Sequence, residues 1–521
     1  MLSARTKKSF ASWMGNLPES KVLLFGIISL GITLRCIKYL ADRSLWLDEA
    51  FLALNLITKD AAQLTQPLDL GQAAPVVFLI VEKLSITFFG TSEYALRLFP
   101  LLCGISSLFL FYLIIKKFHK PAVVIASLGL FSISGTLVYY SSELKPYSTD
   151  VTITLAIYFS AFSFLTKRIL SNKDIFLFGL VGSVSIWTSF PAIFILSGIG
   201  IVDIFDRLYN YKNLNVKKLC ALYIFFILNF AVLYFISLRG ISANQGFFTF
   251  WEGSFLPLPP WSISGLKWLL VTFYEIFWIP GGLYFSIISG ILFIVGCRTL
   301  YGKDRTYFSF LLIPILFVLL ASSLRKYPFS GRLILFIVPT MLICIVEGAE
   351  AIRQMLFRNK VWLTTAIAAL LIISSIPYHL RPWLRPCRSE EIKPVLGYIS
   401  QNLRKSDKIY IYFAAQYAFS YYAERYNLAG SNYIIGISAK NDPGKLSNDL
   451  DKLRAAGRAW VLFSHSYNQC LSDSDSEQKI FDEERFSVNY LDNIGSRIDT
   501  FKSAGASGYL YDLTENSRQD P

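Results

Sequence analysis

The sequence is poor in charged side chains and lacks the common motifs for metals, redox cofactors and nucleotides. Only 17% of its 521 residues are Asp, Glu, Lys or Arg, whereas 54% are hydrophobic, a balance outside the range of ordinary soluble enzymes. The seven cysteines form no CxxC pair and the three histidines are isolated, which excludes the usual zinc, haem and iron–sulfur patterns. No glycine-rich phosphate loop follows a predicted strand in the C-terminal part, so nucleotide binding there is unsupported.

Long apolar runs are what the sequence has in abundance. Blocks of about 18 to 22 residues with almost no charge are long enough to cross a bilayer as helices. We predict a polytopic α-helical membrane protein with about eleven transmembrane helices. The predicted spans are residues 21–40, 96–115, 121–140, 147–166, 175–189, 191–205, 219–238, 283–297, 306–322, 333–350 and 361–377. No small-residue cleavage site follows the first span, so it is expected to be a retained anchor.

The net charge of +14 belongs entirely to this apolar part. Residues 380–521 carry 18 basic and 18 acidic side chains, so they contribute nothing to the net charge. Basic residues between apolar helices usually set topology rather than bind nucleic acid, and membrane lipids, not nucleic acids, are the expected surroundings. The basic clusters fall on alternate connections, which predicts a cytoplasmic N-terminus. An odd number of spans then places the C-terminal residues outside.

The sequence predicts two domains. Residues 1–379 form a transmembrane domain, whose first outer loop, 41–95, contains the amphipathic stretches Leu45–Ile57 and Pro75–Phe89. Residues 380–521 form an extracytoplasmic α/β domain. Its predicted strands are Lys408–Phe413, Ala459–Phe463 and Gly508–Leu513, and its predicted helices are Glu390–Arg404, Ala414–Tyr426 and Leu446–Ala456. Cys387 and Cys470 are the only cysteines of this domain, and an oxidising compartment would permit a disulfide between them.

One pair of acidic residues stands out in the first outer loop. Asp48 and Glu49 follow the first span and are flanked by Trp46, Leu47 and Phe51. Most adjacent acidic residues belong to solvated loops. An apolar segment close to the membrane makes a functional carboxylate the better interpretation here.

Four motifs in this order resemble the GT-C superfamily of membrane glycosyltransferases, in particular glycosyltransferase family 39, of the protein O-mannosyltransferase and aminoarabinose-transferase type. They are WLDEA (Trp46–Ala50), FFGTSEYALRLFPLLCG (Phe88–Gly104), YYSSELKPYS (Tyr139–Ser148) and KYPFSGRLILFIVP (Lys326–Pro339). Each motif alone is weak, but all four fall on one predicted face of the membrane. The sequence departs from the family pattern at Gly331-Arg332-Leu333, where many relatives have Arg-Tyr-Leu, and in a proline-rich stretch reduced to Ala73-Ala74-Pro75.

The resemblance implies an inverting transfer of a hexose or pentose from a polyprenyl-phosphate donor to an acceptor hydroxyl. The acceptor would be a lipid, a glycan or a protein, and the reaction would take place at the outer face of a bacterial cytoplasmic membrane. Asp48 is the candidate general base, and Glu49 would orient the acceptor or share that role. Candidates for stabilising the leaving phosphate or binding the substrates are Arg97, Glu143, Lys145, Tyr147, Arg325, Lys326 and Arg332.

Several alternatives stay open at this level. Arg97 and Arg332 would also suit snorkelling at helix ends, and Glu143 with Lys145 would suit a weak surface ion pair. Glu82 is expected on a solvated helix face. No cofactor is specified, although the acidic pair would also suit a divalent cation. A lipid-linked glycan transporter and a polysaccharide polymerase or ligase are the competing functions; the lack of an internal repeat weakens the transporter.

Overall fold

The computed structural model describes residues 21–514 except for 166, 168–169, 211–215, 243–244, 357–363, 365, 372, 374–389, 440–441 and 466–481. The chain forms two compact units. The first comprises Met1–Ala41 and Lys59–Tyr378, and the second comprises Asp42–Thr58 and His379–Pro521. The short segment that carries Asp48 and Glu49 therefore packs with the C-terminal residues, and the domain boundary near residue 379 stays a prediction.

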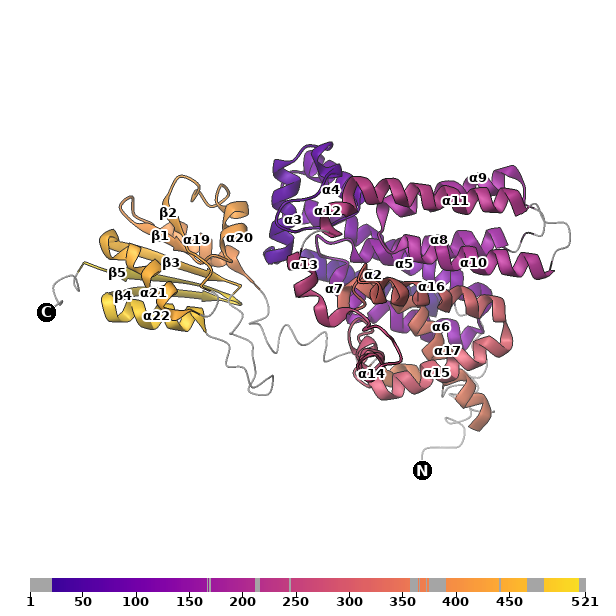
Figure 1. Cartoon of the computed structure of the whole chain (residues 1–521). Helices are drawn as coiled ribbons and strands as arrows, with labels where there is room; N and C mark the ends of the chain where they lie inside the picture. Colours follow the sequence, from indigo (N-terminus) through magenta and orange to yellow (C-terminus); the bar gives the residue numbers. More distant parts are fainter. Residues whose placement is uncertain are drawn as a thin grey trace, which may run out of the picture. The chain divides into compact units, whose positions relative to one another are not determined.

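The first unit is built from helices (Figure 1). Its α-helices are α2 (Lys21–Leu40), α4 (Val76–Phe89), α5 (Glu93–Phe118), α6 (Pro121–Ile133), α7 (Gly135–Tyr140), α8 (Tyr147–Leu165), α9 (Asn172–Thr188), α10 (Ala192–Asn210), α11 (Val216–Leu233), α12 (Arg239–Ser242), α13 (Gln245–Phe250), α14 (Ile263–Trp278), α15 (Ser286–Lys303), α16 (Arg305–Ser323) and α17 (Val338–Leu356). Short 3₁₀ turns η1 (Gln63–Thr65), η3 (Glu252–Ser254) and η4 (Gly331–Ile337) and the π turn η2 (Tyr234–Leu238) connect or extend them.

Six helical segments among the described residues are long and apolar enough to cross a membrane. They are Lys21–Leu40, Glu93–Phe118, Lys217–Leu238, Ser286–Lys303, Arg305–Ser323 and Gly331–Leu356. The predicted count of about eleven is therefore not confirmed. The predicted span 121–140 is divided at Ser134, whose ψ of 117° interrupts the helix between α6 and α7. Most of the predicted span 361–377 lies outside the described residues.

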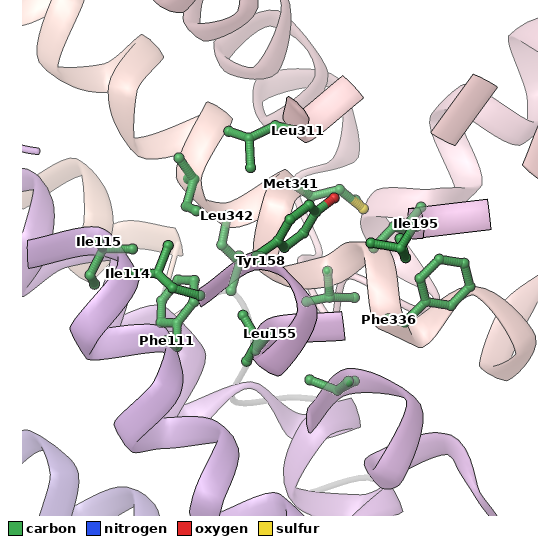
Figure 2. Packing of buried hydrophobic residues seen from close by; sticks show 14 of the residues in the cluster. Phe111, Ile114, Ile115, Leu155, Tyr158, Ile195, Leu311, Phe336, Met341 and Leu342 are labelled. Carbon is green, nitrogen blue, oxygen red and sulfur yellow. The ribbon is translucent and has the colours of Figure 1, made fainter. Parts of the chain in front are cut away.

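The core of the first unit is a continuous apolar cluster to which helices far apart in the sequence contribute (Figure 2). Phe111 of α5 stacks on Phe131 of α6, with their ring centroids 4.4 Å apart. Tyr158 of α8 lies among Leu342 and Met341 of α17. Because lipid tails are as apolar as these side chains, close van der Waals packing rather than exclusion of water holds such helices together.

Helices α15 and α17 approach each other closely at two glycines. A Cβ atom built on Gly296 of α15 would lie 1.8 Å from the carbonyl oxygen of Cys344, and one built on Gly348 of α17 would lie 1.9 Å from that of Leu292. Both distances are far inside van der Waals contact. Small residues at a helix interface let two backbones approach in this way, so the α15–α17 contact requires glycine at both positions.

The second unit contains a five-stranded sheet in the order β2-β1-β3-β5-β4. Its elements are α3 (Leu47–Thr58), α19 (Ile392–Asn402), β1 (Lys408–Ile411), α20 (Gln416–Tyr422), β2 (Asn432–Ile435), α21 (Pro443–Leu450), the 3₁₀ turn η6 (Asp451–Ala456), β3 (Arg458–Ser464), α22 (Glu483–Ile494), β4 (Ser496–Ser503) and β5 (Ala506–Asp512). Strand β1 pairs in parallel with β2 and with β3, whereas β5 is antiparallel to both β3 and β4. The prediction of a small C-terminal α/β sheet is confirmed.

Helices cover both faces of this sheet. Gly508 of β5 faces α19, because a Cβ at this position would lie 3.0 Å from a methyl carbon of Val395. The neighbouring Tyr509 points the other way and donates a hydrogen bond to Glu484 of α22 (2.9 Å). Successive side chains of a strand point to opposite faces, so α19 and α22 lie on opposite sides of β5.

Candidate functional site

The acidic pair lies in the first turn of α3, in the second unit. The helix begins at Leu47, and the amide of Ala50 donates to the carbonyl of Trp46 (2.9 Å). The Glu49 side chain is fully buried, whereas Asp48 is only partly buried. Carboxylates in a first helical turn interact favourably with the positive end of the helix dipole. Of the two acids, Asp48 is the one that keeps access to solvent.

Side chains from the C-terminal residues hold the backbone of this segment. The Leu45 amide donates to the Tyr422 hydroxyl (2.9 Å), and the Leu47 amide donates to Oε2 of Glu390 (2.9 Å). The ring of Phe51 packs edge-on against Tyr417, with centroids 4.5 Å apart. More than 340 positions of sequence separate the partners of these hydrogen bonds. The position of Asp48 therefore depends on how the C-terminal residues fold.

The turn before α8 brings three other candidates together in the first unit. Glu143 and Lys145 are buried, with 0% and 6% of their surfaces exposed, and Tyr147 is also buried at the start of α8. The Lys145 ammonium donates to Oε1 of Gln72 (2.6 Å). The interpretation of Glu143 and Lys145 as a solvated surface pair is therefore wrong.

Arg97 lies in α5, one turn beyond the helix start. Gly90 adopts a φ of +79°, which favours glycine, and the Ser92 hydroxyl caps the helix by accepting from the Ala95 amide (3.2 Å). Only 2% of the Arg97 surface is exposed. A side chain so deeply enclosed by protein is not at a lipid-facing helix end, which argues against snorkelling.

Arg332 lies beside Tyr147. Its guanidinium carbon is 5.8 Å from the centroid of the Tyr147 ring, within cation–π range. The preceding Gly331 has a φ of +51°, a backbone conformation that a β-branched or bulky residue rarely adopts. The departure from the Arg-Tyr-Leu pattern thus coincides with a turn whose backbone conformation favours glycine.

Arg325 and Lys326 differ from the other basic candidates because both are exposed at the end of α16. Arg325 lies 3.9 Å from a carboxylate oxygen of Glu252, and both side chains are more than 60% exposed. Such ion pairs contribute little to stability. Arg325 and Lys326 are neighbours in the sequence, and the side chains of both are exposed.

Glu82 in α4 was expected on a solvated face, and that expectation is wrong. Its side chain is fully buried, and neither carboxylate oxygen has a hydrogen-bond partner among the described residues. Burial raises the pKa of this carboxyl well above its ordinary value. The signal was present in the sequence, because Leu79, Glu82 and Ile86 share the helical spacing that defines one buried face.

The possible divalent cation has no defined ligand set here. Within the described ranges, no group of three His, Cys, Asp or Glu side chains is placed to hold a metal ion. Cys387 and Cys470, the two cysteines proposed for a disulfide, lie outside the described residues.

The chain shares its fold with solved structures of ArnT, a protein of the aminoarabinose-transferase type that the four motifs resemble. Two crystal structures of ArnT from Cupriavidus metallidurans share it along almost the whole length of both chains. The apo structure has a TM-score of 0.54 and 10% sequence identity and covers 95% of this chain and 98% of its own. The structure bound to undecaprenyl phosphate has a TM-score of 0.55 and 11% identity and covers 94% and 98%.

A more distant similarity links the chain to the archaeal oligosaccharyltransferase AglB from Archaeoglobus fulgidus, solved with an inhibitory peptide and a dolichol-phosphate. That structure has a TM-score of 0.47 and 11% identity and covers 96% of this chain and 74% of its own. No family model and no curated protein sequence matches the chain. The six described helical segments that are long and apolar enough to cross a bilayer support an integral membrane protein.

Proposed function

We propose that this protein is a glycosyltransferase that moves a sugar from a polyprenyl-phosphate donor to an acceptor hydroxyl. The observation that carries the proposal is the fold shared with ArnT along 94% of this chain, in a structure that holds undecaprenyl phosphate. From that neighbour we infer that this protein also binds a polyprenyl phosphate. Release of free polyprenyl phosphate from a lipid-linked sugar, measured with purified protein, tests the proposal.

Asp48 acts as the general base in this reaction. The acceptor oxygen attacks the anomeric carbon, the bond from that carbon to the phosphate oxygen breaks, and the hydroxyl proton passes to the Asp48 carboxylate. A base must be within hydrogen-bond reach of the acceptor, and the partly exposed Asp48 fits this requirement better than the buried Glu49. Glu49 has the lesser role, in which it orients the acceptor or shares the proton transfer.

Basic side chains of the first unit stabilise the leaving phosphate. Arg332, Lys145 and Arg97 are the best candidates, because partly or fully enclosed cations act on developing charge more strongly than solvated ones. Glu143 and Tyr147 position them, and Arg325 and Lys326 attract the anionic donor from a distance. The acceptor is a lipid, a glycan or a protein, and the site faces the outside of a bacterial cytoplasmic membrane.

The orientation predicts which positions a membrane-impermeant thiol reagent reaches. In Lys405→Cys, the reagent should label intact cells, because the C-terminal domain is outside. In Lys173→Cys, labelling should require permeabilised membranes. Both positions are exposed, and the parent protein, with its seven cysteines, supplies the background. Labelling of Lys173→Cys but not Lys405→Cys in intact cells would contradict the orientation.

Arg332 should act through the donor. Arg332→Ala is expected to weaken binding of a polyprenyl-phosphate sugar by about tenfold or more, which corresponds to the loss of a charged hydrogen bond. Arg332→Lys should restore binding only in part, since the planar fork of the guanidinium is lost. Binding is measured by titration of the lipid in detergent. Arg298→Ala, at an exposed arginine outside the candidate site, is the matched control, and equal effects of both alanine variants would refute a specific role for Arg332.

A further inference from the structure

The residue that precedes the helix carrying Asp48 cannot cap this helix with its side chain. Trp46 precedes Leu47, and an indole only donates hydrogen bonds, so it cannot accept one from the first-turn amides. The first amides of a helix lack partners inside the helix and need an acceptor elsewhere. For the Leu47 amide that acceptor is Oε2 of Glu390 (2.9 Å). Glu390 thus caps α3 from a distant part of the sequence.

The chain that leads into α3 is fixed at further points by the residues next to Glu390. Oε2 of Glu391 accepts from both the amide and the hydroxyl of Ser44 (3.0 Å each). The Lys393 ammonium donates to the carbonyl of Asp42 (2.6 Å) and lies 3.0 Å from its carboxylate. Asp42 itself has a φ of +45°. The residues at the start of α19 therefore hold the segment before Asp48 at Asp42 and Ser44, in addition to Leu47.

His465 holds Glu390 in turn. Its Nδ1 is 2.5 Å from Oε1 of Glu390, so the two oxygens of one carboxylate contact His465 and the Leu47 amide. His465 has a φ of +58°, a conformation that L side chains seldom adopt. Backbone strain of this kind is often retained where a side chain serves a site.

These contacts lie where the sheet has its topological switch point. Strand β1 lies between β2 and β3 and is parallel to both, and His465 directly follows β3. In open α/β sheets, ligands bind at the carboxyl ends of strands at such a point. In this unit, α20, which follows β1, contacts α3 instead through Tyr417 and contacts Leu45, just before α3, through Tyr422. Helix α3 therefore lies at the position where other open α/β sheets bind a ligand.

We infer that Glu390 and His465 are positioning residues for the transfer reaction, and that the C-terminal domain serves catalysis by capping α3 and aiming Asp48. The inference rests on the proposed function, in which Asp48 is the base. A base that is misplaced by about 1 Å can lose as much as 100-fold in rate. Loss of the cap should therefore lower kcat and leave the KM for the donor nearly unchanged, because Asp48 acts in the transition state.

Kinetics of three variants test this inference with the undecaprenyl-phosphate sugar that the wild-type protein consumes. Glu390→Ala should lower kcat by about 10- to 100-fold, and Glu390→Gln should recover most of the loss, since its amide oxygen still accepts from Leu47. His465→Gly should lower kcat while thermal stability is kept or raised, because glycine removes the backbone strain. A purely structural role for His465 predicts the opposite, with kcat unchanged.

Asp449→Ala is the matched control for damage to the C-terminal domain. Asp449 is buried and accepts from the Tyr410 hydroxyl (2.7 Å) and the Ile437 amide (3.0 Å). This variant should destabilise the domain and leave the kcat of the folded fraction unchanged. Equal losses of kcat in Glu390→Ala and Asp449→Ala would overturn the inference.

Hydrogen exchange supplies a readout that needs no activity. Peptides covering residues 44–50 should exchange faster in Glu390→Ala than in the wild type and in Asp449→Ala. Unchanged exchange there would overturn the capping role. Two results separate the role of Asp48 as base from the positioning role of Glu390 and His465. A fully active Asp48→Asn protein overturns both roles. An inactive Asp48→Asn protein together with a fully active Glu390→Ala protein overturns only the positioning role.

Discussion

Asp48→Asn is expected to lose nearly all glycosyl transfer while the protein still folds and inserts. Asparagine keeps the shape of the side chain but cannot take the acceptor proton. Loss of general-base catalysis predicts a fall of at least about 100-fold, chiefly in kcat if the carboxylate acts only in the transition state. Donor turnover by purified protein in detergent measures the effect, and elution as a single folded species verifies that the variant is intact.

Glu49→Gln is the matched comparison. The Glu49 side chain is fully buried in the same helical turn, so its replacement tests the surroundings without removing the proposed base. It should reduce turnover less than Asp48→Asn. If Glu49→Gln abolished transfer and Asp48→Asn retained it, the two roles would be exchanged. If neither change mattered, the acidic pair would be a structural feature of α3 alone.

Gly348→Ala is expected to have the largest effect on stability. The added methyl group would lie 1.9 Å from the carbonyl oxygen of Leu292, and a backbone atom cannot move aside as a flexible side chain can. Helices α15 and α17 would have to separate, at a cost of about 3 kcal/mol or more. Gly296→Ala should behave in the same way, since it meets the backbone of Cys344 at 1.8 Å.

Gly26→Ala provides the control for this prediction. Nothing lies within 4 Å of a Cβ atom built on Gly26 in α2, and alanine favours a helix over glycine by roughly 0.5 to 1 kcal/mol. Thermal unfolding in one detergent should therefore show a large loss for Gly348→Ala and none for Gly26→Ala. Wild-type stability of Gly348→Ala would refute the close α15–α17 packing.

The sequence predicted best the helices and strands whose hydrophobic pattern fits only one type of secondary structure. The predicted span 21–40 coincides with α2, and the amphipathic stretches Leu45–Ile57 and Pro75–Phe89 coincide with α3 and α4. Strands β1, β3 and β5 were predicted because they are central in the sheet and carry near-continuous apolar residues.

The two strands that the sequence did not reveal are both edge strands. Strand β2 is four residues long and mostly exposed, and β4 is mostly exposed along its length with polar and apolar residues interspersed. An edge strand has a partner on one side only and often carries charged or short sequences. Its pattern therefore resembles a loop, and only the pairing with β1 or β5 identifies it.

The residues of the candidate site could be predicted from the sequence, but the contacts that hold these residues in place could not. The resemblance identified Asp48, Arg97 and Arg332 as residues of interest, yet no local pattern distinguishes the buried Arg97 from the exposed Arg325. The cap that Glu390 supplies to α3 joins residues 343 positions apart. Such contacts arise from tertiary packing, and neither helical nor strand periodicity encodes them.

The central claim is that this protein transfers a sugar from a polyprenyl-phosphate donor. It is tested most directly by incubating the purified wild-type protein with a panel of undecaprenyl-phosphate-linked hexoses and pentoses and following each lipid by mass spectrometry. The account predicts that one donor is converted to free undecaprenyl phosphate in the presence of an envelope lipid, glycan or protein acceptor, and that Asp48→Asn does not convert it. A protein that moves the intact lipid-linked sugar across a vesicle membrane and leaves every donor uncleaved would contradict the claim and support a transporter.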